Sequence, residues 1–195
     1  MTAAVGWRPV AASDDLPAGH VYQTRLWDRP LAIWRSARGA VNIWEDRCPH
    51  RGVRFSIGSA LGDELRCQYH AWRFASGSGA CTHIPAQPDL APPETIRATV
   101  FPAVEHAGLV WTQFDNTGGE PPAVSAGSVL RAMPVNRSAA VVEAALAAGE
   151  MAGVSLFVQP VAPDRSVIRG VARDQGSLAG HDAVLERLQR ELEAA

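Results

Sequence analysis

Two short segments of the chain each carry one cysteine and one histidine. The first reads Cys48-Pro49-His50 and the second reads Cys67-Gln68-Tyr69-His70, with sixteen residues between His50 and Cys67. Thiolates and imidazoles are the protein ligands of zinc and of iron–sulfur clusters. The two segments therefore predict a metal centre with four protein ligands, namely Cys48, His50, Cys67 and His70.

The distribution of the ligands distinguishes two kinds of metal centre. Zinc fingers commonly group like ligands, cysteine with cysteine and histidine with histidine. Here each segment supplies one of each type, which suits a [2Fe–2S] cluster of Rieske type, with both cysteines on one iron and both histidines on the other. Two ferric ions, two sulfides and two thiolates sum to zero charge, whereas four thiolates would leave a net negative site. Because a neutral site accepts an electron more easily, Rieske potentials span roughly −150 to +300 mV, against about −400 mV for plant-type ferredoxins.

The residues around the ligands resemble the Rieske domain of the ring-hydroxylating and vanillate O-demethylase-type oxygenase family. The dense part of the resemblance consists of Asp46-Arg47-Cys48-Pro49-His50-Arg51-Gly52, Gly62-Asp63-Glu64-Leu65-Arg66-Cys67-Gln68-Tyr69-His70-Ala71-Trp72-Arg73-Phe74 and Cys81-Thr82-His83-Ile84-Pro85-Ala86-Gln87. Weaker similarity extends from Trp7 to Trp111. The resemblance implies that Cys48, His50, Cys67 and His70 hold one Rieske-type [2Fe–2S] cluster.

The residues that follow the two histidines indicate the subtype. Respiratory-chain Rieske proteins carry an extra cysteine in each loop and join the two as a disulfide, whereas this chain has Arg51 and Ala71 after the histidines. The resemblance is therefore to the oxygenase and ferredoxin branch, with a potential near the low end of the range. The family usually has glycine at the position of Ala71. If that position requires a positive φ, alanine costs about 1 kcal/mol.

Other residues near the ligands have both a functional and a structural interpretation. Tyr69 and Trp72 could cover the cluster or line an electron exit, and core packing is the favoured interpretation for Trp72. Arg51 could dock an acidic partner or be an ordinary solvated arginine. Cys81 and His83 form a further Cys-x-His, but the resemblance implies that this pair does not bind the cluster, and Cys81 is interpreted as structural.

The oxygenases that the chain resembles also hold a mononuclear ferrous iron on two histidines and one carboxylate. In the family the two histidines lie a few residues apart on a helix, and no such pair follows His83 in this sequence. The remaining histidines, His106 and His181, are 75 residues apart. We therefore expect no mononuclear iron. The alternative is an iron site assembled from His106, His181 and a carboxylate such as Asp182.

The first part of the chain is predicted to be rich in β-strands that place the ligands. Apolar runs rich in β-branched and aromatic residues predict a hairpin of strands 31–35 and 40–44, strands at 64–67 and 72–74, a turn at 76–79 and a strand at 108–114. The Gly- and Pro-containing stretch 115–122 reads as a linker. We place a Rieske domain at 1–117 and a shortened α+β segment at 118–195.

The second part is predicted to combine two helices with two strands. The expected elements are an Ala-rich helix at 138–148, strands at 154–161 and 166–171 around a turn at 162–165, and an amphipathic helix at 181–195. This segment is similar to the last strands and final helix of the oxygenase catalytic domain. The expected fold class is mainly β, an antiparallel Rieske-type β domain followed by a small α+β segment.

Composition excludes several other classes of protein. The 195 residues are 47% hydrophobic and 19% charged, which is a globular composition. All 18 basic residues are arginines, the formal net charge is −2, and no long basic run occurs, so no nucleic-acid partner is expected. Glu143 and Glu150 interrupt the longest apolar stretch, so no membrane span is expected. The N-terminus lacks the pattern of a secretory signal, and three cysteines fit a reducing cytoplasm.

The leading hypothesis is a Rieske protein that carries single electrons within an oxygenase system. Its electron donor would be an NAD(P)H-dependent reductase or a ferredoxin, and its acceptor would be an oxygenase subunit. The sequence does not decide whether the chain forms a homo-oligomer. One alternative is a complete Rieske non-haem iron oxygenase, an aromatic hydroxylase or O-demethylase with an atypical iron site. A second alternative is a non-redox, metal-stabilised interaction module, and a third is a decayed oxygenase.

Overall fold

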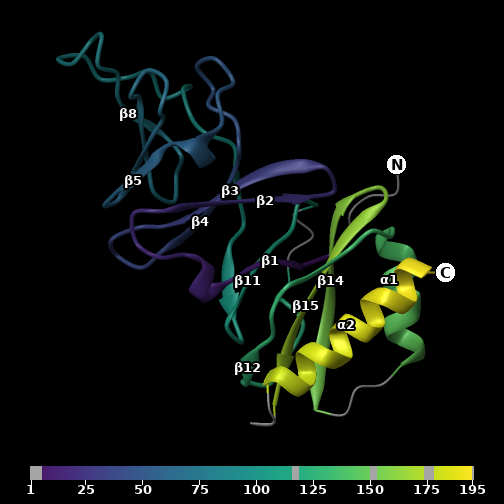
Figure 1. The fold of residues 1–195 in the computed structure, drawn as a ribbon. Helices are drawn as coiled ribbons and strands as arrows, with labels where there is room; N and C mark the ends of the chain where they lie inside the picture. Colours follow the sequence, from purple (N-terminus) through teal and green to yellow (C-terminus); the bar gives the residue numbers. More distant parts are fainter. Residues whose placement is uncertain (1–5, 116–118, 150–152, 174–177, 195) are drawn as a thin grey trace. The chain divides into compact units, whose positions relative to one another are not determined.

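The structure is a computed structural model that describes residues 6–115, 119–149, 153–173 and 178–194. Its contacts divide the chain into two compact units (Figure 1). Unit 1 comprises the described residues of Met1–Ser13, Arg25–Asp28 and Val104–Ala195, and unit 2 comprises Asp14–Thr24 and Arg29–Ala103. Both metal-ligand segments lie in unit 2.

Unit 2 is built from short antiparallel strands in two sheets. The first sheet has the order β2-β3-β4-β9, with β2 at Val21–Leu26, β3 at Arg29–Arg35, β4 at Val41–Glu45 and β9 at Val100–Phe101. The second has the order β5-β6-β7-β8, with β5 at Ser59–Leu61, β6 at Glu64–Arg66, β7 at Arg73–Ala75 and β8 at Cys81–His83. A 3-10 turn, η2, spans Phe55–Ile57. Another, η1, spans Ser13–Asp15; Ser13 of η1 and the last two residues of β2 are grouped with unit 1 by contacts.

The hairpin predicted at 31–35 and 40–44 is confirmed, and strands also form near the predicted 64–67 and 72–74. In the β3–β4 hairpin Arg35 lies opposite Val41, and Gly39 in the turn has a φ of +85°, which glycine adopts without steric cost. In the β6–β7 pair Leu65 lies opposite Phe74. β6 ends one residue earlier and β7 begins one residue later than predicted, because Cys67 and Trp72 leave the sheet and close a ligand loop through a backbone hydrogen bond.

Aromatic side chains dominate the core of unit 2. Trp34, Trp44, Phe55 and Phe74 are fully buried. The ring of Trp44 lies 5.3 Å from that of Trp34 and 5.4 Å from that of Phe55, centre to centre, both in edge-to-face contact. Cys48 and Cys67 belong to the same buried cluster of side chains. The two thiols therefore lie at the boundary between the aromatic core and the ligand loops.

Unit 1 contains two further antiparallel sheets. One has the order β1-β11-β10, with β1 at Arg8–Ala12, β10 at Val104–His106 and β11 at Leu109–Thr112. In the other, β15 at Arg165–Ala172 pairs with β12 at Ser128–Val129, β13 at Met133–Val135 and β14 at Val154–Ala162. The predicted strand at 108–114 and the predicted β14–β15 hairpin are confirmed.

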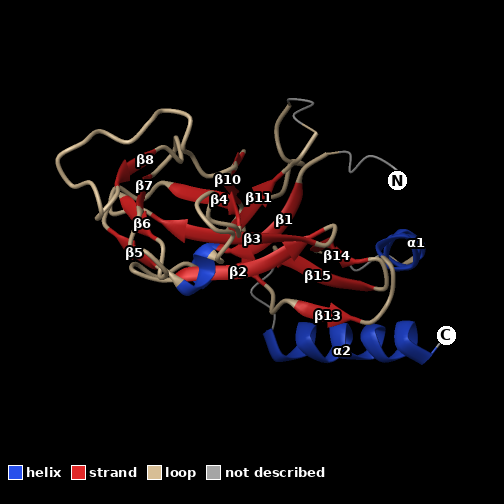
Figure 2. Cartoon of the chain, turned by 90° about the horizontal axis from the view of Figure 1, so that it is seen from above, coloured by secondary structure: helices blue, strands red, loops and turns tan. Residues whose placement is uncertain are grey.

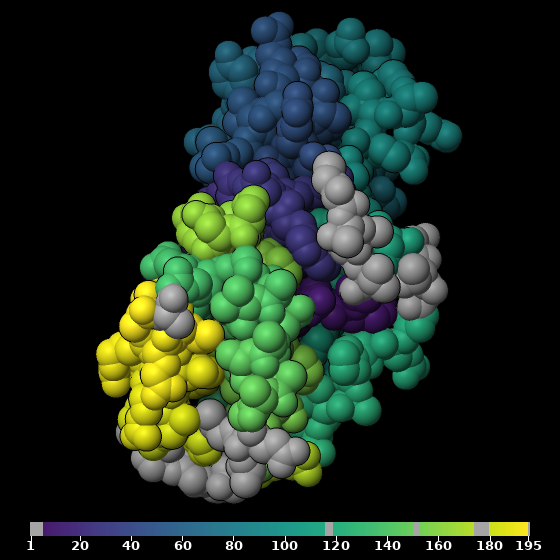
Figure 3. All heavy atoms as spheres, turned by 90° about the vertical axis from the view of Figure 1, so that its right-hand side faces the viewer, coloured from purple at the N-terminus to yellow at the C-terminus, as the bar shows by residue number. Residues whose placement is uncertain are grey.

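Two helices pack on the β12–β15 sheet. Helix α1 spans Ala139–Ala148 and packs on β14, and α2 spans Leu178–Ala194 and packs on β13. Figure 2 shows α2 running along β13, and Figure 3 shows both helices at the surface of this unit. Of the apolar face predicted for α2, Leu185 and Leu192 are buried and Leu188 is partly buried, whereas Val184 is 40% exposed. None of the described helices combines the length and apolar character needed to cross a membrane.

The fold class predicted from the sequence is confirmed, because the chain is mainly antiparallel β with a short C-terminal helix. The boundary predicted between residues 117 and 118 falls at 116–118, outside the described residues, and stays a prediction. By contacts, β1 and β11 group with the C-terminal strands in unit 1. Their pairing places Arg8 opposite Thr112.

Candidate metal centre

The first ligand loop, residues 48–53, is closed by two backbone hydrogen bonds. The Cys48 amide donates to the Val53 carbonyl at 2.8 Å, and the Gly52 amide donates to the Cys48 carbonyl at 2.8 Å. Gly52 has a φ of +74°, a left-handed conformation that costs glycine little. The loop thus holds the backbone around Cys48 and His50 in one defined conformation.

The second ligand loop, residues 67–72, repeats this pattern. The Cys67 amide donates to the Trp72 carbonyl at 2.9 Å, and the Ala71 amide donates to the Cys67 carbonyl at 3.1 Å. Ala71 has a φ of +56° and so occupies the position that Gly52 occupies in the first loop. Position 71 therefore has the positive φ at which alanine is expected to be strained relative to glycine.

Replacing Ala71 with glycine should stabilise the chain. The substitution relieves about 1–2 kcal/mol of strain in the left-handed conformation. Glycine also gives the unfolded chain more conformational entropy, which lowers stability by about 0.4–1 kcal/mol. We therefore expect the free energy of unfolding to rise by about 0.5–1 kcal/mol. Urea unfolding of the cluster-loaded protein measures this change. Ala75→Gly, in the strand β7, is the matched control and should lower stability. A loss of stability in both variants would contradict the account of Ala71.

Asp46 secures the approach to the first loop. Its side chain is buried, and its carboxylate accepts hydrogen bonds from the Ser56 amide at 2.7 Å and from the Ser56 hydroxyl at 2.6 Å. The Asp46 amide donates to the Pro30 carbonyl at 2.9 Å, which fixes the same residue to β3. Asp46 therefore joins the residues that precede and follow the first ligand loop. Asp46 belongs to the segment that carries the family resemblance, but the sequence does not predict its role as a clamp.

The two predicted cysteine ligands lie together in the core. Cys48 is 2% exposed and Cys67 is 3% exposed, and both are free thiols. Burial, together with the neighbouring Cys67 thiol, raises the pKa of Cys48 to about 12. At neutral pH Cys48 is therefore a neutral thiol unless a positive charge stabilises the thiolate. An iron–sulfur core supplies such a charge, so the chemistry of this pair fits the implied group.

The two predicted histidine ligands converge through the same ring atom. The Nδ1 atoms of His50 and His70 are 3.0 Å apart. Two nitrogens bound to one metal ion by bonds of about 2.1 Å lie about 3.0–3.4 Å apart, so the pair fits a shared metal ion. Loss of hydration lowers the pKa of His50, and repulsion by His70 and Arg51 lowers it further. His50 is thereby held towards the neutral form that binds metals.

Each histidine ring is covered by an aromatic side chain from the second loop. The Trp72 ring stacks on His50 at 4.0 Å between centres with an interplanar angle of 6°, and Tyr69 lies against His70 at 3.9 Å. Trp72 also packs against the core cluster of unit 2, so it is both a core residue and a cover for the proposed ligand His50. Tyr69 is 58% exposed. The histidine end of the site is thus near solvent, whereas the cysteine end is in the core.

The structure places the further Cys-x-His motif in a strand. Cys81 is buried in β8 within the core cluster, and its thiol donates a weak hydrogen bond to the His83 carbonyl at 3.8 Å. Burial raises the pKa of Cys81. His83 lies opposite Arg73 in the β7–β8 pair. These contacts suit the structural interpretation of Cys81.

The other candidate ligands lie in unit 1 and have partners there. The Val124 amide donates to Nε2 of His106 at 3.3 Å, and Asp182 pairs with Arg131 at 3.6 Å. Over the described residues, no three His, Cys, Asp or Glu side chains gather as a site for one metal ion. The expectation that the chain holds no mononuclear iron stays a prediction.

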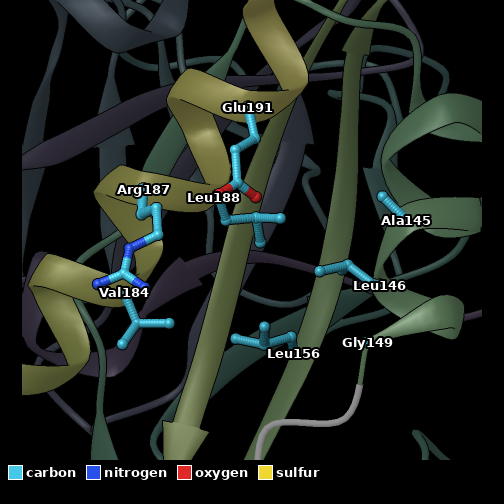
Figure 4. A pocket seen from close by; sticks show the side chains of 8 residues that line it. All are labelled: Ala145, Leu146, Gly149, Leu156, Val184, Arg187, Leu188 and Glu191. Carbon is cyan, nitrogen blue, oxygen red and sulfur yellow. The ribbon is translucent and has the colours of Figure 1, made fainter. Parts of the chain in front are cut away.

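Unit 1 also has an apolar pocket that the sequence did not predict. The pocket has a volume of about 210 Å³ and lies between α1, α2 and β14 (Figure 4). Leu146 and Leu156 face Leu188 across it, and the charged side chains of Arg187 and Glu191 come from α2.

Comparison with known proteins defines the class of the metal centre. Residues 6–98 match the family model described as the Rieske [2Fe-2S] domain. The chain therefore contains a Rieske domain, and its cofactor is one Rieske-type [2Fe–2S] cluster. The predicted family resemblance is confirmed.

Two curated relatives show where such domains occur. The chain is 48% identical to the oxidoreductase NdmD of Pseudomonas putida over 115 residues, covering 59% of this chain and 20% of the relative. It is 36% identical to TsaM1 of Comamonas testosteroni, the iron–sulfur subunit of a toluene-4-sulfonate monooxygenase system, over 105 residues, covering 54% of this chain and 29% of the relative. Over these regions the chain is thus similar to an oxidoreductase and to an iron–sulfur subunit of a monooxygenase system, and it spans less than a third of the length of these relatives.

Solved structures show the same fold over nearly the whole chain. Apo dicamba monooxygenase superimposes with a TM-score of 0.78 at 19% identity, covering 98% of this chain and 83% of that one. NdmA of Pseudomonas putida CBB5 superimposes with a TM-score of 0.79 at 18% identity, covering 97% of this chain and 81% of that one. At these identities the comparison supports the fold of both units.

Proposed function

We propose that this chain is a one-electron carrier of a Rieske oxygenase system. In this proposal Cys48 and Cys67 bind one iron of the cluster, and His50 and His70 bind the other. The observation that carries the proposal is the polarity of the site, with thiols 2% and 3% exposed and a ligand histidine, His70, at the surface. A centre with one buried and one exposed end suits exchange of electrons with a partner at the exposed end.

The chain's own residues keep the site rigid and partly dry. When bound, the cluster takes up one electron and gives it back. The two hydrogen-bonded loops fix all four ligands, so little rearrangement is needed when the charge of the site changes. Trp72 excludes water from one face of His50, and Tyr69 covers His70. The imidazoles then form the shortest route between the buried thiols and a partner at the surface.

The proposed partners follow from the relatives. NdmD is called an oxidoreductase and TsaM1 a subunit of a monooxygenase system. We propose an NAD(P)H-dependent reductase or a ferredoxin as the donor and an oxygenase subunit as the acceptor. The proposed compartment is the cytoplasm, because Cys48 and Cys67 are proposed cluster ligands and the buried Cys81 forms no disulfide among the described residues.

An anaerobic reductive titration of the purified protein tests the proposal. We expect each chain to take up one electron. The visible absorption and the spin signal of the reduced cluster monitor this uptake. The midpoint potential should lie near the low end of the range of roughly −150 to +300 mV. Oxygen consumption coupled to an aromatic substrate would instead identify an oxygenase, and a colourless, redox-inactive protein would identify an interaction module.

A further inference from the structure

The two ligand-loop segments are unusual in charge. Residues 47–62 and 65–88 contain no aspartate or glutamate, although the whole chain has a formal net charge of −2. The same segments contain five arginines, namely Arg47, Arg51, Arg54, Arg66 and Arg73. The part of the chain that carries the ligands is therefore positive, opposite in sign to the chain as a whole.

Most of these arginines have no acidic partner among the residues that the structure describes. Arg73 pairs with Glu64 at 3.6 Å. Over the part of the chain that the structure describes, the side chains of Arg47, Arg51 and Arg54 form no ion pair, and all three are exposed. By contrast, Arg8 in unit 1 pairs with Glu143 at 2.6 Å. The charges near the ligands are thus available to a partner.

Arg51 lies in the first ligand loop, and Arg47 and Arg54 flank that loop directly in the sequence. Arg51 directly follows His50, and the Arg47 side chain lies over the same loop, with Nε 3.4 Å from the position of a Cβ at Gly52. Tyr69 rests on the ring of His70, whose Nδ1 is 3.0 Å from that of His50. We call Arg47, Arg51, Arg54, Tyr69 and His70 the cluster face.

The composition of the cluster face fits a protein partner. Arginine and tyrosine are enriched at protein–protein interfaces. Tyr69, 58% exposed, offers an apolar contact directly on a ligand ring. Unpaired surface charge of one sign steers a partner of opposite charge and raises its association rate. Isolated arginines around one aromatic side chain do not form the long basic stripe that nucleic-acid binding requires.

We propose that the cluster face is the docking surface for a redox partner protein whose own contact surface is acidic. Arg51 and Arg54 attract the partner's carboxylates, and Tyr69 provides the apolar contact over His70. This inference rests on the proposed function, because it specifies the kind of protein with which the cluster exchanges electrons.

Two small oxidants of opposite charge probe the electrostatic field at this face. The cluster-loaded protein is reduced with dithionite, freed of excess reductant, and mixed in a stopped-flow instrument with hexacyanoferrate(III) or hexaammineruthenium(III). In each reaction one electron leaves the reduced cluster and reduces the oxidant's metal from the +3 to the +2 state. The variant is Arg51→Glu/Arg54→Glu, and the control with the same change in net charge is Arg165→Glu/Arg190→Glu, in unit 1.

The proposal predicts opposite changes for the two oxidants. In the variant the rate with the anionic oxidant should fall about tenfold and the rate with the cationic oxidant should rise about threefold or more, at low ionic strength. The control should change either rate less than about twofold. A shift in midpoint potential would move both rates in the same direction, so that result, or unchanged rates, would overturn the proposal.

A protein donor tests docking itself. A reduced plant-type ferredoxin, chosen for net negative charge, has a potential of about −400 mV and can pass one electron to the oxidised cluster. This rate should fall several-fold with added salt in the natural protein, and about tenfold in the Arg51→Glu/Arg54→Glu variant. Absence of visible absorption would count against the proposed function. An intact spectrum with a rate indifferent to salt and to the substitutions would overturn the docking proposal alone.

Discussion

Substitution of a single proposed ligand will abolish the visible absorption of the cluster. His70→Ala leaves one iron with a single protein ligand, and Cys67→Ser replaces a thiolate with a hydroxyl that stays protonated at neutral pH. Each change removes one of the four proposed protein ligands. The ligand loops contain no other cysteine that could supply a replacement thiolate. We expect complete loss of visible absorption and of bound iron in each purified variant.

Cys81→Ser is the matched control for these substitutions. Cys81 is as buried as a ligand cysteine would be, but it lies in β8 and its thiol contacts the His83 carbonyl. We therefore expect the serine variant to keep its cluster and spectrum. Retained absorption in Cys67→Ser combined with its loss in Cys81→Ser would show that the ligand assignment is wrong.

Trp44→Ala should cost about 3–5 kcal/mol of the free energy of unfolding, the usual effect of truncating a buried aromatic side chain. Trp44 is fully buried and makes edge-to-face contacts with Phe55 at 5.4 Å and Phe74 at 6.5 Å. Phe55 follows the first ligand loop and Phe74 follows the second. The cavity would therefore loosen both loops, and the cluster should be lost at a lower temperature. Thermal unfolding followed by visible absorption measures the effect.

Trp44→Phe separates packing from hydrogen bonding at this position. The indole Nε1 of Trp44 is buried and has no hydrogen-bond partner within the described residues. Phenylalanine removes this unpaired group while keeping an aromatic ring, so we expect a loss of less than about half that of the alanine variant. Equal losses in the two variants would mean that the core is not held by the ring contacts.

Local sequence patterns predicted the hairpins and the ligand loops well. The turn at Gly39 and the alternation around Leu65 act over a few residues, so the pattern alone contains them. The pairing of β1 with β11 was not predicted, because Arg8 and Thr112 are far apart in the sequence and neither strand identifies its partner. Short strands such as β9, at Val100–Phe101, carry too few residues to show an alternation.

The sequence proposes the four ligands because few residue types bind metals and the candidates are closely spaced, and this assignment stays a prediction. The surroundings of these residues are harder to predict. The hydrogen bond between Asp46 and Ser56 joins residues on both sides of the first ligand loop. The sequence alone does not predict that the Asp46 carboxylate is buried rather than exposed to solvent. The stacking of Trp72 on His50 joins the two loops and depends on their spatial arrangement. The repeated hydrogen-bond pattern of the loops is likewise hidden, because one histidine is two residues after its cysteine and the other is three.

Iron and acid-labile sulfide, counted per chain on anaerobically purified protein, test the central claim most directly. A chain that carries one Rieske cluster and acts only in electron transfer should contain two irons and two sulfides, the content of a [2Fe–2S] cluster. A third iron without additional sulfide would contradict this account, because it would reveal a mononuclear site and favour an oxygenase. Zinc in place of iron, without sulfide, would contradict the cluster itself.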